Sequence, residues 1–191
     1  RPFYDYFSYE FAEAKLSTEE FRQLRAMFLF LTYINMDEAV MPMKTMLGGH
    51  PDFFSDIKGV SGLAAFLFPD HPYAREMADN FEKSVALNLQ YHTRPNIPAW
   101  DAKGGRWTEN LACYVWASLR NTTRTSFLLH YFYDGKNRLM QPNFSLLANW
   151  LMNSLAAPLD IENGKRVMPP QGAHHRRDVP PYSLYLLGQD L

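Results

Sequence analysis

The sequence predicts an all-α fold built from stacked helical hairpins. Apolar residues recur at steps of three and four in several segments, which is the spacing of one helix face. No segment sustains the alternation of apolar and polar residues that is typical of a β-strand. Glycine and proline clusters separate the apolar segments, so consecutive helices are expected to pack as hairpins. This pattern is compatible with a bundle, a solenoid or part of an α/α toroid, in which paired helices ring a central cleft.

The first helix carries the clearest local signal in the chain. Ser17-Thr18-Glu19-Glu20 has the S-x-x-E form of a capping box, in which the serine and the last glutamate satisfy open backbone donors at the helix start. The apolar stripe that follows predicts a helix to about residue 36. A shorter helix is expected at residues 53–68, where Gly59 and Gly62 weaken the helical pattern.

A long connector separates the remaining predicted helices. An amphipathic helix is expected at residues 73–91, where apolar side chains fall four residues apart. Residues 93–105 then combine prolines with glycines, and connectors of this length are usually functional or disordered. Thr108 can cap a helix that reaches about residue 120. Two further helices are expected at residues 122–133 and 143–156.

The chain ends in a proline-rich tail, residues 157–191, which is expected to form an ordered loop or an edge that needs a partner. Residues 1–191 are therefore interpreted as one helical domain or as a fragment of a larger helical domain. The sequence begins at Arg1 without a signal-peptide pattern, which suggests a processed or excised piece.

Composition excludes several classes of partner. The net charge is −1, from 19 basic and 20 acidic residues, so no sequence-wide field attracts nucleic acid or an anionic membrane. No apolar run approaches the roughly 20 residues that cross a bilayer, which argues against membrane insertion. The single cysteine, Cys113, cannot form a disulfide within the chain.

Groups that act on polar ligands are concentrated between Tyr91 and Tyr114. Arg94 and Arg106 can each hold a carboxylate or a sulfate through a two-pronged hydrogen bond. Trp100 and Trp107 offer flat apolar faces for a sugar ring, although either ring can instead plug a helix end. We therefore expect an acidic polysaccharide or oligosaccharide as the partner of this segment.

The helix that starts at Thr108 supplies the candidate catalytic groups. Asn110 and Tyr114 are four residues apart and so share a helix face. In β-elimination of a uronic acid, an amide can stabilise charge on the substrate carboxylate while a tyrosine transfers protons. Glu109 and His92 are possible assistants. The structural alternative is a polar asparagine, a packed tyrosine and a glutamate that complements the helix dipole.

Histidines elsewhere in the chain do not form a recognisable metal motif. His50, His71 and His92 are evenly spaced, but no H-E-x-x-H or Cys/His ligand pair accompanies them, so we predict no metal ligands and no cofactor. His174 and His175 precede two arginines and could form a second substrate-binding patch or a solvated basic loop. The G-x-S-x-G elbow, the P-loop and the dinucleotide fingerprint are absent.

Residues 104–111 (Gly-Gly-Arg-Trp-Thr-Glu-Asn-Leu) and 164–174 (Gly-Lys-Arg-Val-Met-Pro-Pro-Gln-Gly-Ala-His) resemble bacterial heparinase II/III-like and related polysaccharide lyases. The resemblance covers mainly residues 70–175. It implies an α/α toroid, β-elimination of a uronic-acid polysaccharide and a periplasmic or secreted location. The positions that match the lyase groups, a Tyr, a His, an Asn or Glu and a nearby Arg, are Tyr114, His92, Asn110, Glu109 and Arg106.

The chain also departs from this family's pattern. The lyases pair the toroid with β-sandwich domains, but no β-sandwich follows here, and 191 residues supply too few hairpins for a full toroid. An incomplete toroid that needs the remainder of a larger chain is therefore expected. Two other functions stay open: a glycoside hydrolase with Glu109 and Asp101 as its acid and base, and a non-catalytic helical module that binds glycan or protein.

Overall fold

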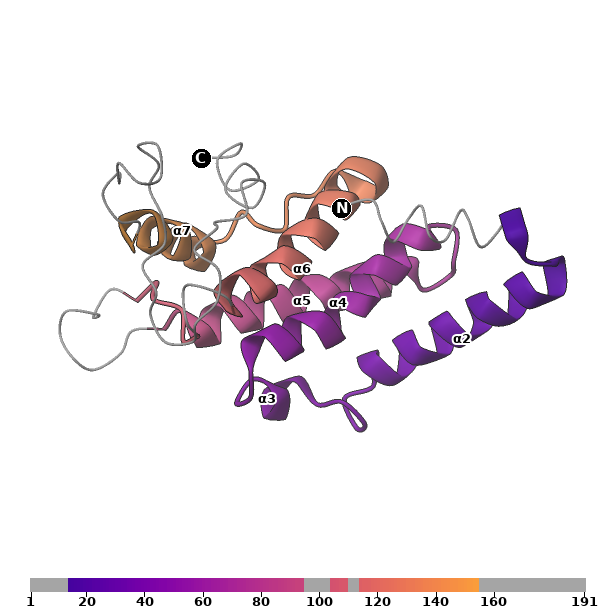
Figure 1. Ribbon diagram of the computed structural model, residues 1–191, viewed down its shortest axis with the longest axis horizontal. Helices are drawn as coiled ribbons and strands as arrows, with labels where there is room; N and C mark the ends of the chain where they lie inside the picture. The colour runs from indigo at the N-terminus through magenta and orange to yellow at the C-terminus, as the bar shows by residue number, and fades with distance from the viewer. Residues whose placement is uncertain (1–13, 95–103, 110–113, 155–191) are drawn as a thin grey trace, which may run out of the picture.

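The computed structural model describes residues 14–94, 104–109 and 114–154 (Figure 1). Within these ranges the regular structure is entirely helical, which confirms the predicted all-α class. The elements are α2 (Thr18–Met36), α3 (Met43–Met46), α4 (Pro51–Leu67), α5 (Ala74–His92), α6 (Tyr114–Leu129), the π-helical turn η2 (His130–Asp134) and α7 (Pro142–Ser154). No helix in these ranges is long and apolar enough to cross a membrane.

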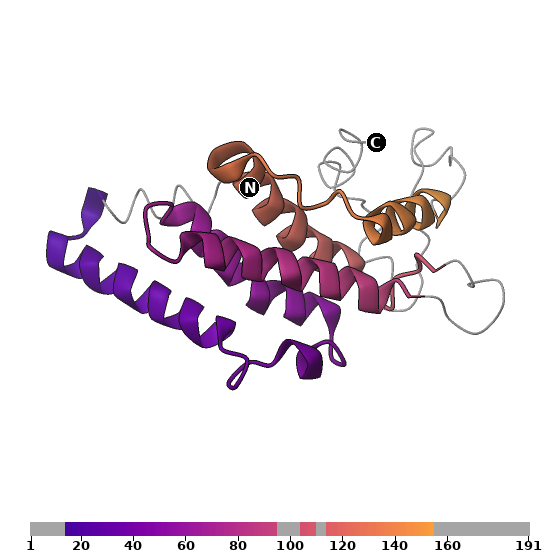
Figure 2. The same ribbon diagram turned by 180° about the vertical axis from the view of Figure 1, so that it is seen from behind.

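Helices α4, α5 and α6 form the centre of the molecule. Helix α4 packs against both α5 and α6, while α2 lies along α4 on the outside and α7 contacts α5 (Figures 1 and 2). A single cluster of buried apolar side chains joins these helices, and it includes Ala64, Phe68, Met77, Phe81, Leu89, Val115, Leu119, Leu129, Phe144 and Leu147. Burial of each large apolar side chain contributes roughly 1.5–3 kcal/mol to stability.

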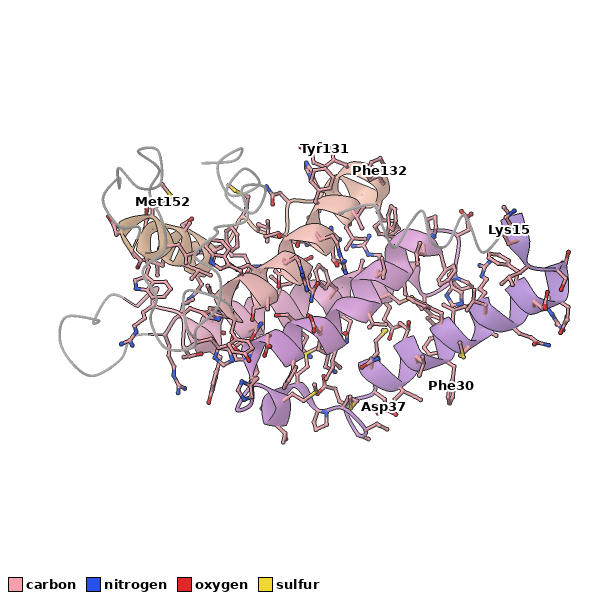
Figure 3. All side chains as sticks on the ribbon, viewed as in Figure 1. Lys15, Phe30, Asp37, Tyr131, Phe132 and Met152 are labelled. Carbon is pink, nitrogen blue, oxygen red and sulfur yellow. The ribbon has the colours of Figure 1, made fainter. Side chains whose placement is uncertain are left out.

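Helix α2 begins at the predicted capping box. The Glu20 amide donates to Ser17 Oγ at 3.3 Å, and Glu20 Oε2 accepts from the Ser17 amide at 2.9 Å. Its apolar stripe is only partly used, because Phe28 packs against the core whereas Leu31 is 48% exposed. Phe30, labelled in Figure 3, is 62% exposed on the outer face. The side chains of α2 that pack against the core are Phe28, Leu29 and Met36.

Lys58 of α4 supplies one of those attachments. Its side chain is buried, and Nζ donates to the carbonyl oxygens of Asn35 at 2.5 Å and Met41 at 2.7 Å. Burial lowers the pKa of the Lys58 ammonium, although nearby Glu38 opposes the shift. These charge-assisted bonds tie the end of α2 and the following loop to the central helices.

The two glycines of α4 have different surroundings. A Cβ on Gly62 would lie 2.5 Å from Thr125 Cγ2 and 2.6 Å from the Phe81 ring, so α5 and α6 approach the backbone of α4 closely at this residue. A Cβ on Gly59 would meet nothing within 4 Å. Gly62 lowers the local helix propensity, but the close approach of α5 and α6 requires a glycine at this position. The helix forms here because its tertiary contacts outweigh the low propensity.

The predicted break between residues 120 and 122 is wrong, since α6 continues without interruption to Leu129. Thr122 and Thr123 were expected to open a new helix. Their hydroxyls instead donate to the carbonyl oxygens of Ser118 at 3.1 Å and Leu119 at 2.6 Å, within the same helix. Bonding to the preceding turn lets threonine occupy a helix interior with its hydroxyl satisfied.

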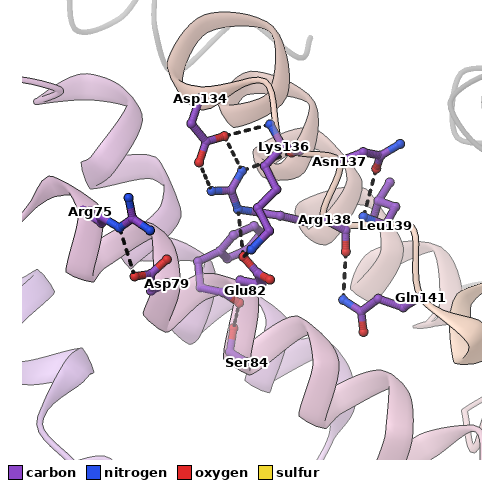
Figure 4. A network of polar contacts seen from close by, with 11 residues as sticks. Arg75, Asp79, Glu82, Ser84, Asp134, Lys136, Asn137, Arg138, Leu139 and Gln141 are labelled. Carbon is purple, nitrogen blue, oxygen red and sulfur yellow. Dashed lines mark hydrogen bonds and ion pairs between the residues drawn. The ribbon is translucent and has the colours of Figure 1, made fainter.

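A network of charged side chains surrounds the end of η2 (Figure 4). Arg138 is 2% exposed and donates to both carboxylate oxygens of Asp134, at 2.9 and 2.5 Å. Glu82 Oε2 lies 2.7 Å from Lys136 Nζ and 3.8 Å from Arg138 Nε. Burial alone would raise the pKa of Asp134, but the Arg138 hydrogen bonds reverse the shift and lower it. Two cations and two anions thus balance one another.

Candidate functional site

The candidate site lies where the N-terminus of α4, the C-terminus of α5 and the start of α6 meet residues 104–109. The Gly105 amide donates to the Thr93 carbonyl at 2.8 Å, and Asn143 Nδ2 donates to Thr93 Oγ1 at 3.0 Å. Gly105 has φ +98°, and a Cβ there would lie 2.7 Å from the Leu146 carbonyl oxygen of α7. Only glycine fits this approach, so Gly105 fixes the path of the segment that carries Arg106 to Glu109.

His92 is a buried ring in this site. It is 4% exposed, its Nδ1 lies 2.7 Å from Thr108 Oγ1, and its ring packs 5.4 Å from the Trp107 ring. Burial, assisted by the positive charge of Arg94, lowers the pKa of His92 to about 4, while the backbone of Leu47 opposes the shift. The Nε2 atom of His92 makes no hydrogen bond of standard geometry within the described part of the chain. His92 is therefore neutral near pH 7 and connects α5 to residues 104–109.

Trp107 is 2% exposed, and the structure places it as a packed ring rather than an open face. Its Nε1 donates to Glu109 Oε2 at 3.0 Å. A buried indole with its N–H satisfied is an anchor for the backbone around it. Of the two interpretations of this tryptophan, the packing one agrees with its position.

The two carboxylate oxygens of Glu109 have different surroundings. Oε2 accepts from Trp107 Nε1 and from Ser118 Oγ at 3.1 Å, whereas Oε1 is buried and makes no hydrogen bond of standard geometry with the described residues. Oε1 lies 3.7 Å from His50 Nδ1. Burial raises the pKa of Glu109, the bonds from Trp107 and Ser118 lower it, and the nearby Asp52 carboxyl raises it further through its charge and through a side-chain hydrogen bond.

Sequence reasoning missed the contribution of α4 to this site. His50 is the N-cap residue, Pro51 occupies the first turn, and Asp52 follows as a buried carboxyl. Ligand atoms of His50, Asp52 and Glu109 lie within 4.8 Å of one another, which makes these three side chains the candidates for holding a metal ion. The His-Pro-Asp order at a predicted helix start was the available signal, but it does not reveal that Glu109 lies opposite.

The exposed groups of the site surround this buried layer. The Arg94 guanidinium stacks 4.2 Å above the centre of the Tyr91 ring, and Arg106 is also exposed. Tyr114 is 38% exposed in the first turn of α6, four residues before Ser118, so it lies on the side of α6 that contacts Glu109. Two arginines and a tyrosine are therefore exposed at this end of the molecule.

Several predicted site residues lie outside the described residues. These are Trp100, Asp101, Asn110, His174 and His175. The described segments bring together His92, Trp107 and Glu109 directly, and they place Arg94, Arg106 and Tyr114 around them.

Comparisons with protein-family models, with curated proteins and with solved structures found no match to this chain.

Proposed function

We propose that this protein cleaves a uronic-acid-containing polysaccharide by β-elimination, as part of an incomplete α/α toroid. The observation that supports the proposal is the combination of exposed Arg94, Arg106 and Tyr114 beside a buried polar layer at one end of the central helices. Arginines suit the carboxylates of the polymer, and a tyrosine suits proton transfer at the sugar.

The two arginines bind the substrate carboxylates. The hydrogen bond between Thr93 and Gly105 joins the two segments at residues next to Arg94 and Arg106. Each guanidinium presents a planar fork that matches a carboxylate, and the Tyr91 ring beneath Arg94 restricts its movement. Acidic sugar units of one polymer are therefore held along this edge.

Tyr114 transfers the protons of the elimination. Removal of the C5 proton of a uronate places negative charge on the carboxylate, the C4–O bond breaks, and a C4–C5 double bond forms. The departing oxygen takes up a proton, so the reaction needs no external oxidant or reductant. The partly exposed phenol of Tyr114 on α6 is a suitable proton donor and acceptor for these steps. The arginines bound to the substrate carboxylates stabilise the developing negative charge.

The buried layer keeps these groups in place. His92, Thr108 and Trp107 bind the 104–109 segment to the end of α5, and Ser118 links the same segment to α6 through Glu109. Rigid support of this kind matters because small misplacements of binding groups cost large factors in rate.

The test uses polymers of glucuronate, galacturonate and guluronate. The proposal predicts products with the ultraviolet absorbance of an unsaturated uronate, and it predicts that Tyr114→Phe abolishes turnover while polymer still binds. Tyr131→Phe is the control, because Tyr131 is 57% exposed beyond the far end of α6.

Two outcomes would contradict the proposal. New reducing ends without this absorbance would identify a glycoside hydrolase, and binding without any cleavage would identify a non-catalytic glycan-binding module.

A further inference from the structure

We infer that His50, Asp52 and Glu109 form a binding site for a divalent transition-metal ion. The three side chains come from two parts of the chain: His50 and Asp52 from the start of α4, and Glu109 from the segment before α6. Their ligand atoms lie within 4.8 Å of one another. One imidazole nitrogen and two carboxylates are a donor set that zinc accepts.

The separation between His50 and Glu109 fits a shared ion. His50 Nδ1 and Glu109 Oε1 are 3.7 Å apart, which is too long for a hydrogen bond. Two ligand atoms that each lie about 2.1 Å from a tetrahedral zinc ion are separated by about 3.4 Å. The exposed His50 side chain can move closer to Glu109 to reach this separation.

A second observation points to a ligand independently of the clustering. The Glu109 side chain is only 8% exposed, and its Oε1 atom accepts no hydrogen bond of standard geometry within the described ranges, although Oε2 accepts two and the Asp52 carboxyl lies near enough to raise the pKa of Glu109. A buried carboxylate oxygen without a donor is costly, and it is rare in folded proteins. Asp52, itself buried, adds a second acid beside it. A divalent cation compensates both acids at once.

The surroundings orient the ligands as metal sites require. Trp107 and Ser118 hold Glu109 by its other oxygen, and the Phe53 amide donates to Asp52 Oδ1 at 2.8 Å. Such outer contacts fix the direction in which a ligand presents its free atom. His50 is 69% exposed and packs edge-on against Phe53, so the ion has a route from solvent and can keep a water molecule as its fourth ligand.

The donor set favours zinc over calcium or magnesium. Calcium binds six to eight oxygen ligands, and magnesium keeps an octahedral shell of oxygens and waters, whereas an imidazole suits zinc and its neighbours in the first transition row. This inference does not rest on the proposed polysaccharide cleavage. It departs from the expectation that the protein needs no cofactor, and direct metal binding decides between the two.

The experiment is a calorimetric titration of the chelator-treated, full chain with Zn²⁺. The wild type should bind one ion saturably, and its melting temperature should rise when Zn²⁺ is added. His50→Ala, which removes an exposed side chain, should bind Zn²⁺ at least about tenfold more weakly and lose the rise in melting temperature. Glu109→Gln should also weaken binding.

Two controls separate this site from other histidines. His71→Ala removes a half-buried histidine that contacts Tyr33 far from His50 in sequence, and it should leave affinity unchanged. A double variant with His174→Ala and His175→Ala removes the tail pair and should also retain the site. Equal Zn²⁺ affinity in wild type and His50→Ala, or loss of binding only in the double variant, would overturn the inference. Calcium or magnesium binding as tight as zinc would overturn the choice of metal.

Discussion

Two clusters of charged side chains lie at opposite ends of the central helices, and they differ in how their charges are compensated. Around Arg138, the acids Asp134 and Glu82 each contact a cation. Around Glu109, the buried acid Asp52 is a neighbour, the exposed His50 has its Nδ1 3.7 Å from Oε1, and Oε1 has no hydrogen bond of standard geometry in the described part of the chain. The first arrangement pairs each acid with a cation within the protein, and we expect it to serve stability, although Glu82 Oε2 and Arg138 Nε have no hydrogen bond of standard geometry. The second places two buried acids beside the exposed His50, and this grouping is the basis of the metal site inferred above.

The largest expected effect is at the balanced cluster. Arg138→Met keeps an unbranched stem in the buried position but leaves Asp134 without its two-pronged partner, so we expect a loss of about 3 kcal/mol in the free energy of unfolding. Urea unfolding followed by circular dichroism measures this change. A loss below about 1 kcal/mol would show that this cluster is no more structural than an exposed ion pair.

The scaffold that holds both clusters is tested by the two glycines of α4. Gly62→Ala places a methyl group against Thr125 and Phe81, and we expect it to cost roughly 2–3 kcal/mol because α5 and α6 must move apart. Gly59→Ala is the matched control and should stabilise the protein by about 0.5–1 kcal/mol, since the added methyl group meets open space within a helix. Equal effects of the two substitutions would contradict the close packing at Gly62.

The burial of neutral His92 predicts a pH dependence of stability. The pKa of His92 is lowered from 6.5 to about 4 in the folded protein, so between these values the unfolded chain binds a proton that the folded chain does not. Stability from this residue is fully present above about pH 6.5 and falls as the pH drops, by at most about 1.4 kcal/mol per pH unit. His92→Gln should remove this part of the dependence. The measurement is urea unfolding of both proteins from pH 7 to pH 4.5, and parallel curves would contradict a buried neutral ring.

The smallest expected change in stability is at Glu109. Glu109→Gln retains an acceptor for Trp107 and Ser118 and removes a charge beside Asp52, so the metal-free protein should be unchanged or more stable by less than about 1 kcal/mol. Chelator-treated samples in urea provide the measurement. A loss as large as that of Arg138→Met would show that both clusters serve folding and would remove the distinction between them.

Local signals in the sequence predicted the elements that local interactions determine. The capping box at Ser17 fixed the start of α2, and the apolar spacing in residues 73–91 predicted α5 closely. The break before Thr122 was wrong because the Thr122 hydroxyl donates to the preceding turn of the same helix, a contact that the sequence pattern does not reveal. Gly62 was interpreted as a weakness because its value depends on α5 and α6, which are distant in sequence.

Prediction of the site likewise differed between residues that are close in sequence and residues that are far apart in sequence. His92 and Glu109 lie inside the segment that composition singled out, and the structure does join them through Thr108 and Trp107. His50 and Asp52 were not grouped with them, because only the packing of α4 against α6 brings these residues to Glu109. Trp107 resembled a sugar platform in sequence, and its burial depends on neighbours that the sequence does not specify.

The central claim, that an anionic polymer binds beside the incompletely compensated cluster, is tested most directly by the affinity of a polyuronate for Arg106→Lys. This change keeps the charge and loses the planar fork, so we predict roughly three- to tenfold weaker binding of the folded protein. Binding by the wild type should weaken with added salt, because an exposed contact between charges is screened. Arg75→Lys, at an exposed arginine that pairs with Asp79 away from the site, should bind like the wild type. Unchanged affinity together with a lower melting temperature for Arg106→Lys would contradict the claim.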